Sequence, residues 1–265
     1  MTTSGQDRHS MTEFIDRVLF IAHDNEGSRH ILRTLVEDHP HLEFLVMQTT
    51  GLYYRKSILH SLWKLLRESS FLFGVNRMID LGLGRMKRNL SLSRYCRELD
   101  ITLHKTLDIN NEDSIKIMQG FNPDIIAVTF TMHIISEQVI RQAKIATLGV
   151  HPSLIPEYRG LEVFFWMMAN GESEGGTSVF LLTPEVDIGH VLETERWPIL
   201  ATDTVSDVYG RLTKSCANSL SRTIARNDIH KIQDPRPAKA DEGSYFPMPT
   251  REAYSRFKKR GYRWR

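Results

Sequence analysis

Short apolar segments alternate with segments of helical pattern through the first 150 residues, and this alternation limits the possible folds more than any other feature. Each apolar segment is short and bounded by polar residues, which predicts a buried strand. The predicted strands are residues 18–22, 43–48, 101–106, 124–130 and 145–150. The predicted helices between or after them are residues 29–37, 91–99, 111–120 and 136–144. This order predicts an α/β fold with a doubly wound, mostly parallel sheet.

The last of these strands leads directly to His151, which is followed by Pro152. Proline cannot donate a hydrogen bond to a sheet, so the strand is expected to stop there and leave His151 at its carboxyl end. Open parallel sheets bind their ligands at that end. A later strand, residues 178–182, leads into a turn that carries Asp187. We predict that His151 and Asp187 form a base with an orienting partner; the alternatives are a structural histidine and a turn-forming Asp.

The residues around His151 and Asp187 resemble the signature of the folate-dependent formyltransferases. This family includes enzymes that formylate glycinamide ribonucleotide, methionyl-tRNA and sugar nucleotides. Its signature is Asn-x-His-Pro-Ser-Leu-Leu-Pro-x-x-Arg-Gly, then Gly-x-Thr, then Asp-x-Gly. The corresponding segments are residues 149–160, 176–177 and 187–189. Order and spacing match over about residues 125–192, which is far more specific than a lone glycine motif.

The resemblance implies a Rossmann-like formyltransferase fold and a transfer of formyl groups from 10-formyltetrahydrofolate. It makes His151 and Asp187 the expected catalytic residues. The residues expected to bind the cofactor are Met132, His133, Ile134, Ile135, Ser153 and Gly189. Apolar side chains at residues 132–135 would enclose the flat pterin ring while backbone groups bind its edge; a hydrophobic plug is the alternative. The histidines show no metal-ligand spacing, so we expect no metal.

Gly149 stands where the family signature has Asn, and Phe180 stands where some members have His. The Asn side chain donates to the oxyanion, and losing one such donor costs about 100- to 1000-fold in rate. Three possibilities stay open. His151 holds the oxyanion alone, another donor has replaced the Asn, or the chain binds folate without efficient transfer. The candidate donors by residue type are Thr129, Thr131, His133 and Asn170. We favour a divergent active enzyme.

Length and composition fit one α/β domain with a short extension. The chain has 265 residues, of which 41% are hydrophobic and 25% charged, as in ordinary globular proteins. Its two cysteines lie far apart, so we expect no disulfide and a cytoplasmic location. The first ten residues lack a signal-peptide core, and no apolar run is long enough to predict a membrane span. The formal net charge of +2 neither favours nor excludes a nucleic-acid partner.

The predicted boundaries are a catalytic domain at residues 11–228 and a C-terminal extension at residues 229–265. Residues 49–89 are expected to be a helical insert packed on the sheet edge, with a lid or a membrane-surface helix as the alternative. The basic residues 258–265 are expected to be a solvated terminus, with phosphate contact as the alternative. For residues 23–28, an anion site and an ordinary strand-to-helix turn carry equal weight.

The extension is too short for the tRNA-binding barrel that methionyl-tRNA formyltransferases carry. We therefore expect a small-molecule amine as acceptor, such as a nucleotide-linked amino sugar, and not a nucleic acid. A hydrolase that releases formate from the same donor is one alternative. A non-catalytic relative that binds folate is another. The sequence identifies neither the amine nor the oligomeric state.

Overall fold

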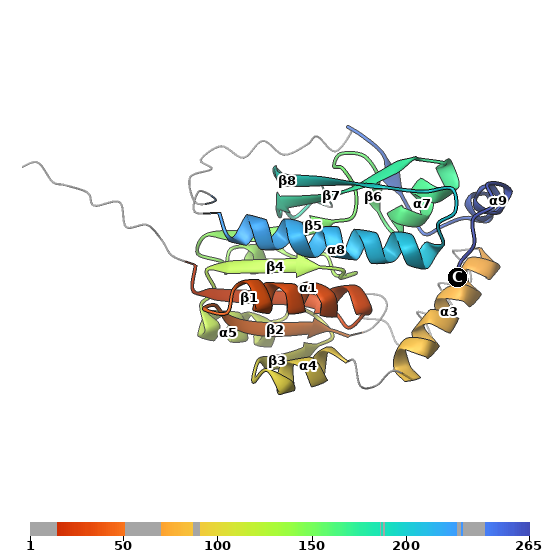
Figure 1. The fold of residues 1–265 in the computed structure, drawn as a ribbon. Coiled ribbons are helices and arrows are strands. Elements are labelled where there is room, and N and C mark those ends of the chain that lie inside the picture. Colours follow the sequence, from red (N-terminus) through yellow and green to blue (C-terminus); the bar gives the residue numbers. More distant parts are fainter. Residues whose placement is uncertain are drawn as a thin grey trace, which may run out of the picture.

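The computed structural model describes residues 15–50, 70–86, 91–185, 187, 189–226, 229 and 242–265. The strands of its main sheet are β1 (Arg17–His23), β2 (Glu43–Thr49), β3 (Thr102–Thr106), β4 (Ile125–Thr129), β5 (Ala146–His151), β7 (Glu174–Leu181) and β8 (Val191–Pro198). They lie in the order β3-β2-β1-β4-β5-β7-β8 (Figure 1). The first five are parallel, whereas β7 and β8 are antiparallel to their neighbours. The predicted mostly parallel sheet is confirmed.

Helices cover both faces of this sheet. The helices among the described residues are α1 (Glu26–Asp38), α3 (Phe71–Met86), α4 (Leu92–Glu98), α5 (Glu112–Phe121), α6 (Glu137–Ile140), α7 (Val163–Asn170), α8 (Val205–Ile224) and α9 (Arg251–Lys259). Several begin at a side chain that accepts a hydrogen bond from the first turn, as Ser91, Asn111 and Ser136 do. In Figure 1, α1 and α8 lie side by side in front of the sheet, and α5 lies behind it.

The sheet separates two apolar cores. In β1, Val18, Phe20 and Ala22 pack into one core, whereas Leu19 and Ile21 pack into the other. Both faces of the central strands are therefore buried, which is why these strands form continuous apolar runs in the sequence.

The adjacent glycines Gly175 and Gly176 predict a turn from the sequence, and this prediction is wrong. Both lie inside β7. A Cβ atom on Gly175 would lie 2.1 Å from the ring of Trp197, and one on Gly176 would lie 2.3 Å from Cγ of Leu154. Glycine stands here because neighbouring side chains pack directly against the backbone of the strand.

Two predicted helices differ in their bounds. The helix expected at residues 136–144 ends at Ile140, because the N–H groups of Lys144 and Ile145 donate to carbonyls of Pro123 and Asp124 beside β4. The residues after the central motif also predict a helix at about residues 160–170, but this helix begins at Val163, since Arg159–Gly160 forms a short strand, β6.

The C-terminal segment packs into the domain. Trp264 and Tyr262 are buried, and the indole Nε1 of Trp264 donates to Asp80 of α3 at 2.9 Å. The Trp264 ring also contacts the rings of Phe73 and Phe165. The expectation of a solvated terminus is wrong for these aromatic residues, because burying them stabilises the fold more than exposing them.

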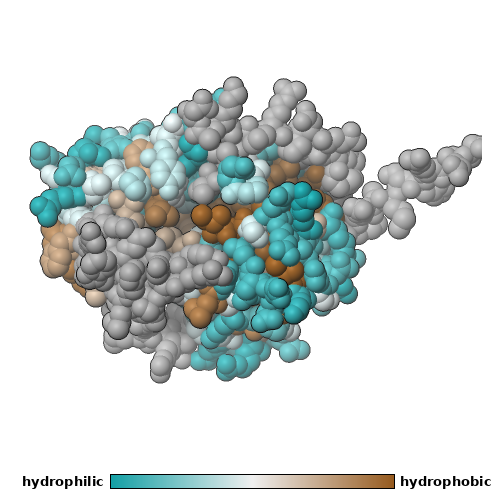
Figure 2. All heavy atoms as spheres, turned by 180° about the vertical axis from the view of Figure 1, so that it is seen from behind, coloured by the Kyte–Doolittle hydropathy of each residue, from teal (hydrophilic) through white to brown (hydrophobic). Residues whose placement is uncertain are grey.

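Helix α3 and residues 49, 50 and 70 are the part of the expected insert that the structure describes, while residues 51–69 and 87–90 lie outside the described residues. Residues 233–237, where two prolines predict a linker-like break, also lie outside them. One side of α3 packs on the domain through Phe73, while its other side is exposed (Figure 2, brown, left edge). Among the described residues, no helix is both long and apolar enough to cross a bilayer.

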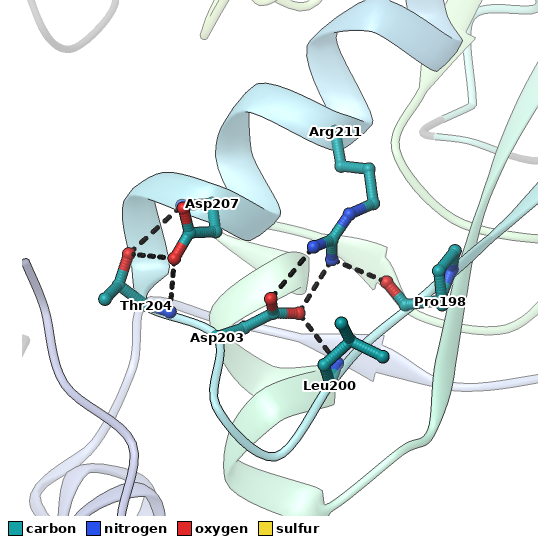
Figure 3. A network of polar contacts seen from close by, with 6 residues as sticks. All are labelled: Pro198, Leu200, Asp203, Thr204, Asp207 and Arg211. Atoms are coloured by element: carbon teal, nitrogen blue, oxygen red, sulfur yellow. Dashed lines mark hydrogen bonds and ion pairs between the residues drawn. The ribbon is translucent and has the colours of Figure 1, made fainter.

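A polar network fixes the turn between β8 and α8 (Figure 3). The buried carboxylate of Asp203 accepts hydrogen bonds from Nη1 and Nη2 of Arg211 at 2.7 and 2.8 Å. It also accepts from the backbone N–H of Leu200 at 2.7 Å, and Arg211 donates to the carbonyl of Pro198 at 2.7 Å. The hydrogen bonds from Arg211 hold the pKa of Asp203 below its ordinary value.

We expect Asp203→Asn to lower the free energy of unfolding by about 2–4 kcal/mol at neutral pH, because it breaks a largely buried bidentate ion pair. The folded-state pKa is depressed, so this contribution is fully present above the unfolded pKa of about 3.9 and is lost as the pH falls through the folded value. Urea unfolding at neutral and acid pH measures the difference between wild type and variant. Asp113→Asn, at an exposed site, is the matched control. A difference that stays constant down to acid pH would contradict this account.

Candidate active site

His151 is the last residue of β5 and lies at the carboxyl edge of the parallel strands. Its side chain is only 8% exposed. Its Nε2 atom lies 2.8 Å from the carbonyl oxygen of Tyr158. A carbonyl oxygen only accepts hydrogen bonds, so Nε2 must carry a proton, and Nδ1 of the neutral ring is then an acceptor.

Asp187 approaches the opposite side of this ring from the loop between β7 and β8. Its Oδ2 atom lies 3.6 Å from Nδ1 of His151. The same oxygen accepts a hydrogen bond from the backbone N–H of Gly160 at 3.2 Å, which holds the carboxylate in place. The backbone of Asp187 has a φ of 53°, a left-handed conformation that Asp adopts more readily than most residues. The structure thus brings together the two residues predicted to be catalytic.

Two hydrogen-bond acceptors therefore face each other across this gap. With Nε2–H engaged by Tyr158, the lone pair of Nδ1 points toward a carboxylate that also carries only lone pairs. A proton placed on Nδ1 would complete a hydrogen bond to Asp187 and give a charged ring with a partner on each side. The arrangement is suited to taking up a proton.

The C-terminal segment positions the two backbone groups that bind His151 and Asp187, namely the carbonyl of Tyr158 and the N–H of Gly160. The N–H of Tyr158 donates to Oγ of Ser244 at 2.9 Å, and β6 (Arg159–Gly160) pairs with β9 (Tyr245–Phe246). Gly160 has a φ of 104°, and a Cβ atom there would lie 2.2 Å from the carbonyl oxygen of Phe246, so only glycine fits. The Tyr158 carbonyl and the Gly160 N–H are therefore set by a segment more than 80 residues away.

Ser153 and Gly189, predicted to bind the cofactor, shape the two loops. Ser153 is fully buried, and its hydroxyl donates to the carbonyl of Glu157 at 2.7 Å. A Cβ atom on Gly189 would lie 1.7 Å from the carbonyl oxygen of Leu181. These contacts give both residues a structural role, and their contact with a cofactor stays a prediction.

The segment expected to hold the pterin ring follows β4. Its exposed side chains are Met132 and Ile134, and its buried ones are His133 and Ile135. The side chain of Asn110 holds this segment with two hydrogen bonds. Its Nδ2 donates to the carbonyl of Ile134 and its Oδ1 accepts from the N–H of Ser136, each at 2.8 Å. Two backbone groups of this loop are thus already engaged. Sequence reasoning missed Asn110, since an Asn in a loop carries no signal of its partner.

Burial shifts the pKa values of both cysteines and of two histidines near the sheet. Burial raises the pKa of the Cys96 and Cys216 thiols to about 12, so neither supplies a thiolate. Burial also lowers the pKa of His23 and His133, which keeps both rings neutral near neutral pH. His133 lies close enough to Asp108 for that carboxylate to raise its pKa, but burial has the larger effect.

Residues 23–28, which could form an anion site or an ordinary turn, contain the end of β1 and the start of α1. Oδ1 of Asn25 accepts from the N–H of Ser28 at 2.8 Å, and Glu26 places a carboxylate in the first turn of α1. The hydroxyl of Tyr209 lies 2.9 Å from the position of a Cβ on Gly27. Protein groups thus cap and cover the start of α1, which favours the turn over the anion site.

A family model described as formyl transferase matches residues 81–224, which is more than half of the chain. The chain belongs to the formyl transferase family. A methionyl-tRNA formyltransferase from Bacteroides thetaiotaomicron is 28% identical over 169 residues, covering 59% of this chain and 52% of the relative. The chain spans about half the length of the curated relatives it matches.

Solved structures share the fold. A sugar N-formyltransferase from a Shewanella species has a TM-score of 0.55 and 16% identity, covering 88% of this chain and 76% of that one. An N-formyltransferase from Helicobacter canadensis, in complex with folinic acid and dTDP-3-aminofucose, has a TM-score of 0.56 and 16% identity, covering 86% and 70%. At such identities the likeness shows a common fold.

The space beside Gly149 is filled by apolar side chains. Phe180 is paired with Gly149 across β5 and β7 and is only 1% exposed. A Cβ atom on Gly149 would lie 2.5 Å from Cζ of Phe180 and 2.9 Å from Cδ1 of Leu182. No polar group is among the three atoms nearest to that position. An aromatic ring thus fills the space that a side chain at position 149 would need.

The candidate replacement donors lie elsewhere. Thr129 pairs with Val150, so its side chain points to the face of the sheet opposite that of His151. The hydroxyl of Thr131 accepts from the backbone of its own loop at 3.2 Å. Asn170 donates to the hydroxyl of Tyr158 at 3.2 Å, and His133 is buried in its own loop. The suggestion that one of these four side chains replaces the Asn is not supported.

Proposed function

We propose that this protein transfers the formyl group of 10-formyltetrahydrofolate to a primary amine of a small molecule. The observation that carries the proposal is the facing pair of acceptors, His151 Nδ1 and Asp187 Oδ2, held 3.6 Å apart at the carboxyl edge of the sheet. Membership of the formyl transferase family supports the reaction class. The exposed side chains of Met132 and Ile134 support a nearby surface for a flat ring.

The reaction begins when the nitrogen of a neutral amine attacks the formyl carbon. A carbon–nitrogen bond forms, the carbonyl electrons move to oxygen, and the amine nitrogen becomes positively charged. One proton passes from this nitrogen to Nδ1 of His151 by way of the facing carboxylate of Asp187, and the charged ring is stabilised by Asp187 on one side and the Tyr158 carbonyl on the other. When the bond to the folate nitrogen breaks, the proton returns by the same route to that leaving nitrogen.

Of the three possibilities left open by Gly149, we propose that His151 acts without a neighbouring amide. Phe180 occupies the space that an Asn side chain would need. The positive charge that the His151 ring gains in the first step then balances the charge on the oxyanion. Because a buried ring has few waters around it, this attraction is weakly screened.

The C-terminal segment packs against the domain, and this supports a small molecule as acceptor over a nucleic acid. Residues 244–246 brace the active-site loop and residues 262–264 pack into the domain, so these residues are committed to the fold. The Helicobacter canadensis relative binds a nucleotide-linked amino sugar, and this supports the same class of acceptor here. We also propose a cytoplasmic location, where such donors and acceptors are made.

Incubation of the full chain with 10-formyltetrahydrofolate tests the proposal. The panel of amines should include dTDP-3-aminofucose and glycinamide ribonucleotide, with tetrahydrofolate, formate and formylated amine measured together. The proposal expects tetrahydrofolate to appear only with an amine, in equal amount to the formylated product. Formate released without an amine indicates a hydrolase, and binding without turnover indicates a non-catalytic folate binder. Either outcome overturns the proposal.

Asp187→Asn should lower kcat/KM by about 100-fold or more. An Asn amide whose oxygen still accepts from Gly160 keeps that oxygen facing Nδ1, but it carries no negative charge and no longer stabilises a protonated ring. Steady-state kinetics measure this loss. Asp100→Asn is the matched control, since Asp100 is exposed and has a similar φ of 55°. Unchanged turnover in Asp187→Asn would rule out a role for this carboxylate.

A further inference from the structure

The outer side of α3 is an exposed apolar stripe. Phe71, Leu72, Met78 and Ile79 are exposed by 64, 53, 39 and 44%. Together with Val75 they fall within one arc of the helix, because they are spaced at one, three or four residues. The opposite side of the helix packs on the domain. The stripe is visible as the brown surface at the left edge of Figure 2.

A cationic segment lies beside this stripe. Residues 251–265 contain seven Lys or Arg and one Glu. They contact α3 directly, since Trp264 and Arg265 both bind Asp80 and the hydroxyl of Tyr254 lies 3.5 Å from Nδ2 of Asn76. In Figure 2 the hydrophilic surface of α9 borders the brown stripe.

Three cations of this segment are available to a partner. Lys258, Lys259 and Arg263 are exposed, and none of them forms an ion pair with another described residue. Apolar side chains that border unpaired cations match a surface with a hydrophobic interior and anionic head groups. A second copy of the chain is a poorer match, because stacking two α3 stripes would bring two cationic segments together.

We propose that the α3 stripe and the adjoining cations bind peripherally to a membrane surface that contains anionic lipid. The apolar side chains insert among the acyl chains near the head groups, and Lys258, Lys259 and Arg263 contact the lipid phosphates. The active site lies at the carboxyl edge of the sheet and shares no residue with this docking surface. Membrane binding therefore requires none of the catalytic groups.

Sedimentation with vesicles tests this. The full chain should pellet with vesicles of phosphatidylcholine mixed with phosphatidylglycerol, and much less with phosphatidylcholine alone. Leu72→Gln/Ile79→Gln should weaken binding at least about 10-fold, because two partly inserted apolar side chains are lost. Lys258→Gln/Lys259→Gln should weaken it by about 25-fold, at about 5-fold per cation, and only on the anionic vesicles. Leu99→Gln, at an exposed site just after α4, is the matched control and should bind as wild type.

Thermal unfolding checks that the variants fold. We expect that they do, because the substituted positions are exposed. If the wild-type protein stays in the supernatant with anionic vesicles, the proposal is overturned. A Leu72→Gln/Ile79→Gln variant that pellets like wild type also overturns it, since the stripe is then covered by something other than lipid. Sedimentation velocity distinguishes a second copy: a dimer that this variant dissociates assigns the stripe to self-association instead.

Discussion

Replacing His151 with Gln should lower kcat/KM for formyl transfer by about 100- to 10,000-fold, the range that a positioned general acid–base typically contributes. The Gln amide can still donate to the carbonyl of Tyr158, so the loop should keep its position. It has no second nitrogen with a lone pair facing Asp187, and it cannot become positively charged. The change therefore removes proton uptake and the charge that balances the oxyanion, while leaving the hydrogen bond that holds the side chain.

Steady-state kinetics with the amine identified by the panel measure this loss. The free energy of unfolding should change by no more than about 1.5 kcal/mol, since one hydrogen bond is exchanged for another. His30→Gln, on the exposed side of α1, is the matched control. A His151→Gln enzyme with the turnover of wild type would mean that His151 is a structural residue.

Gly149 and Phe180 should behave as one coupled pair in stability measurements. Phe180→Ala should lower the free energy of unfolding by about 3–5 kcal/mol, because it removes a buried ring. Gly149→Asn should lower it by about 1–3 kcal/mol, because the new Cβ would lie 2.5 Å from Cζ of Phe180. In the double variant the Asn side chain enters the space left by the ring, so the double loss should be smaller than the sum by about 1 kcal/mol or more.

Urea unfolding of the wild type, the two single variants and the double variant measures this coupling. Gly120→Asn is the matched control for the glycine, since a Cβ there meets nothing within 4 Å. Its cost should not depend on Phe180. Additive losses at positions 149 and 180 would show that the two side chains do not compete for the same space.

The central parallel strands of the sheet could be predicted from the sequence, because burial on both faces makes each of them a continuous apolar run. His151 could also be placed, since the Pro after it stops the strand at that residue. The turn with Asp187 could be placed from its motif. These signals are local, and each depends only on a few adjacent residues.

The partners of the catalytic pair could not be predicted in the same way. The Tyr158 carbonyl and the Gly160 N–H are backbone groups, which every residue has, and their positions depend on a two-residue pairing with β9. The contact between Gly149 and Phe180 joins two strands of opposite direction, and its register is set by the sheet. The docking of Trp264 on α3 is also a long-range contact that no local pattern indicates.

A double-mutant cycle in kcat/KM tests most directly whether the imidazole and the carboxylate work as a unit. It compares His151→Gln, Asp187→Asn and the enzyme with both changes, each confirmed to be folded. If Asp187 acts only through the ring of His151, the double variant should be no slower than His151→Gln alone. Losses that multiply in the double variant would show that the two residues act independently, and the proposed route of the proton would be wrong.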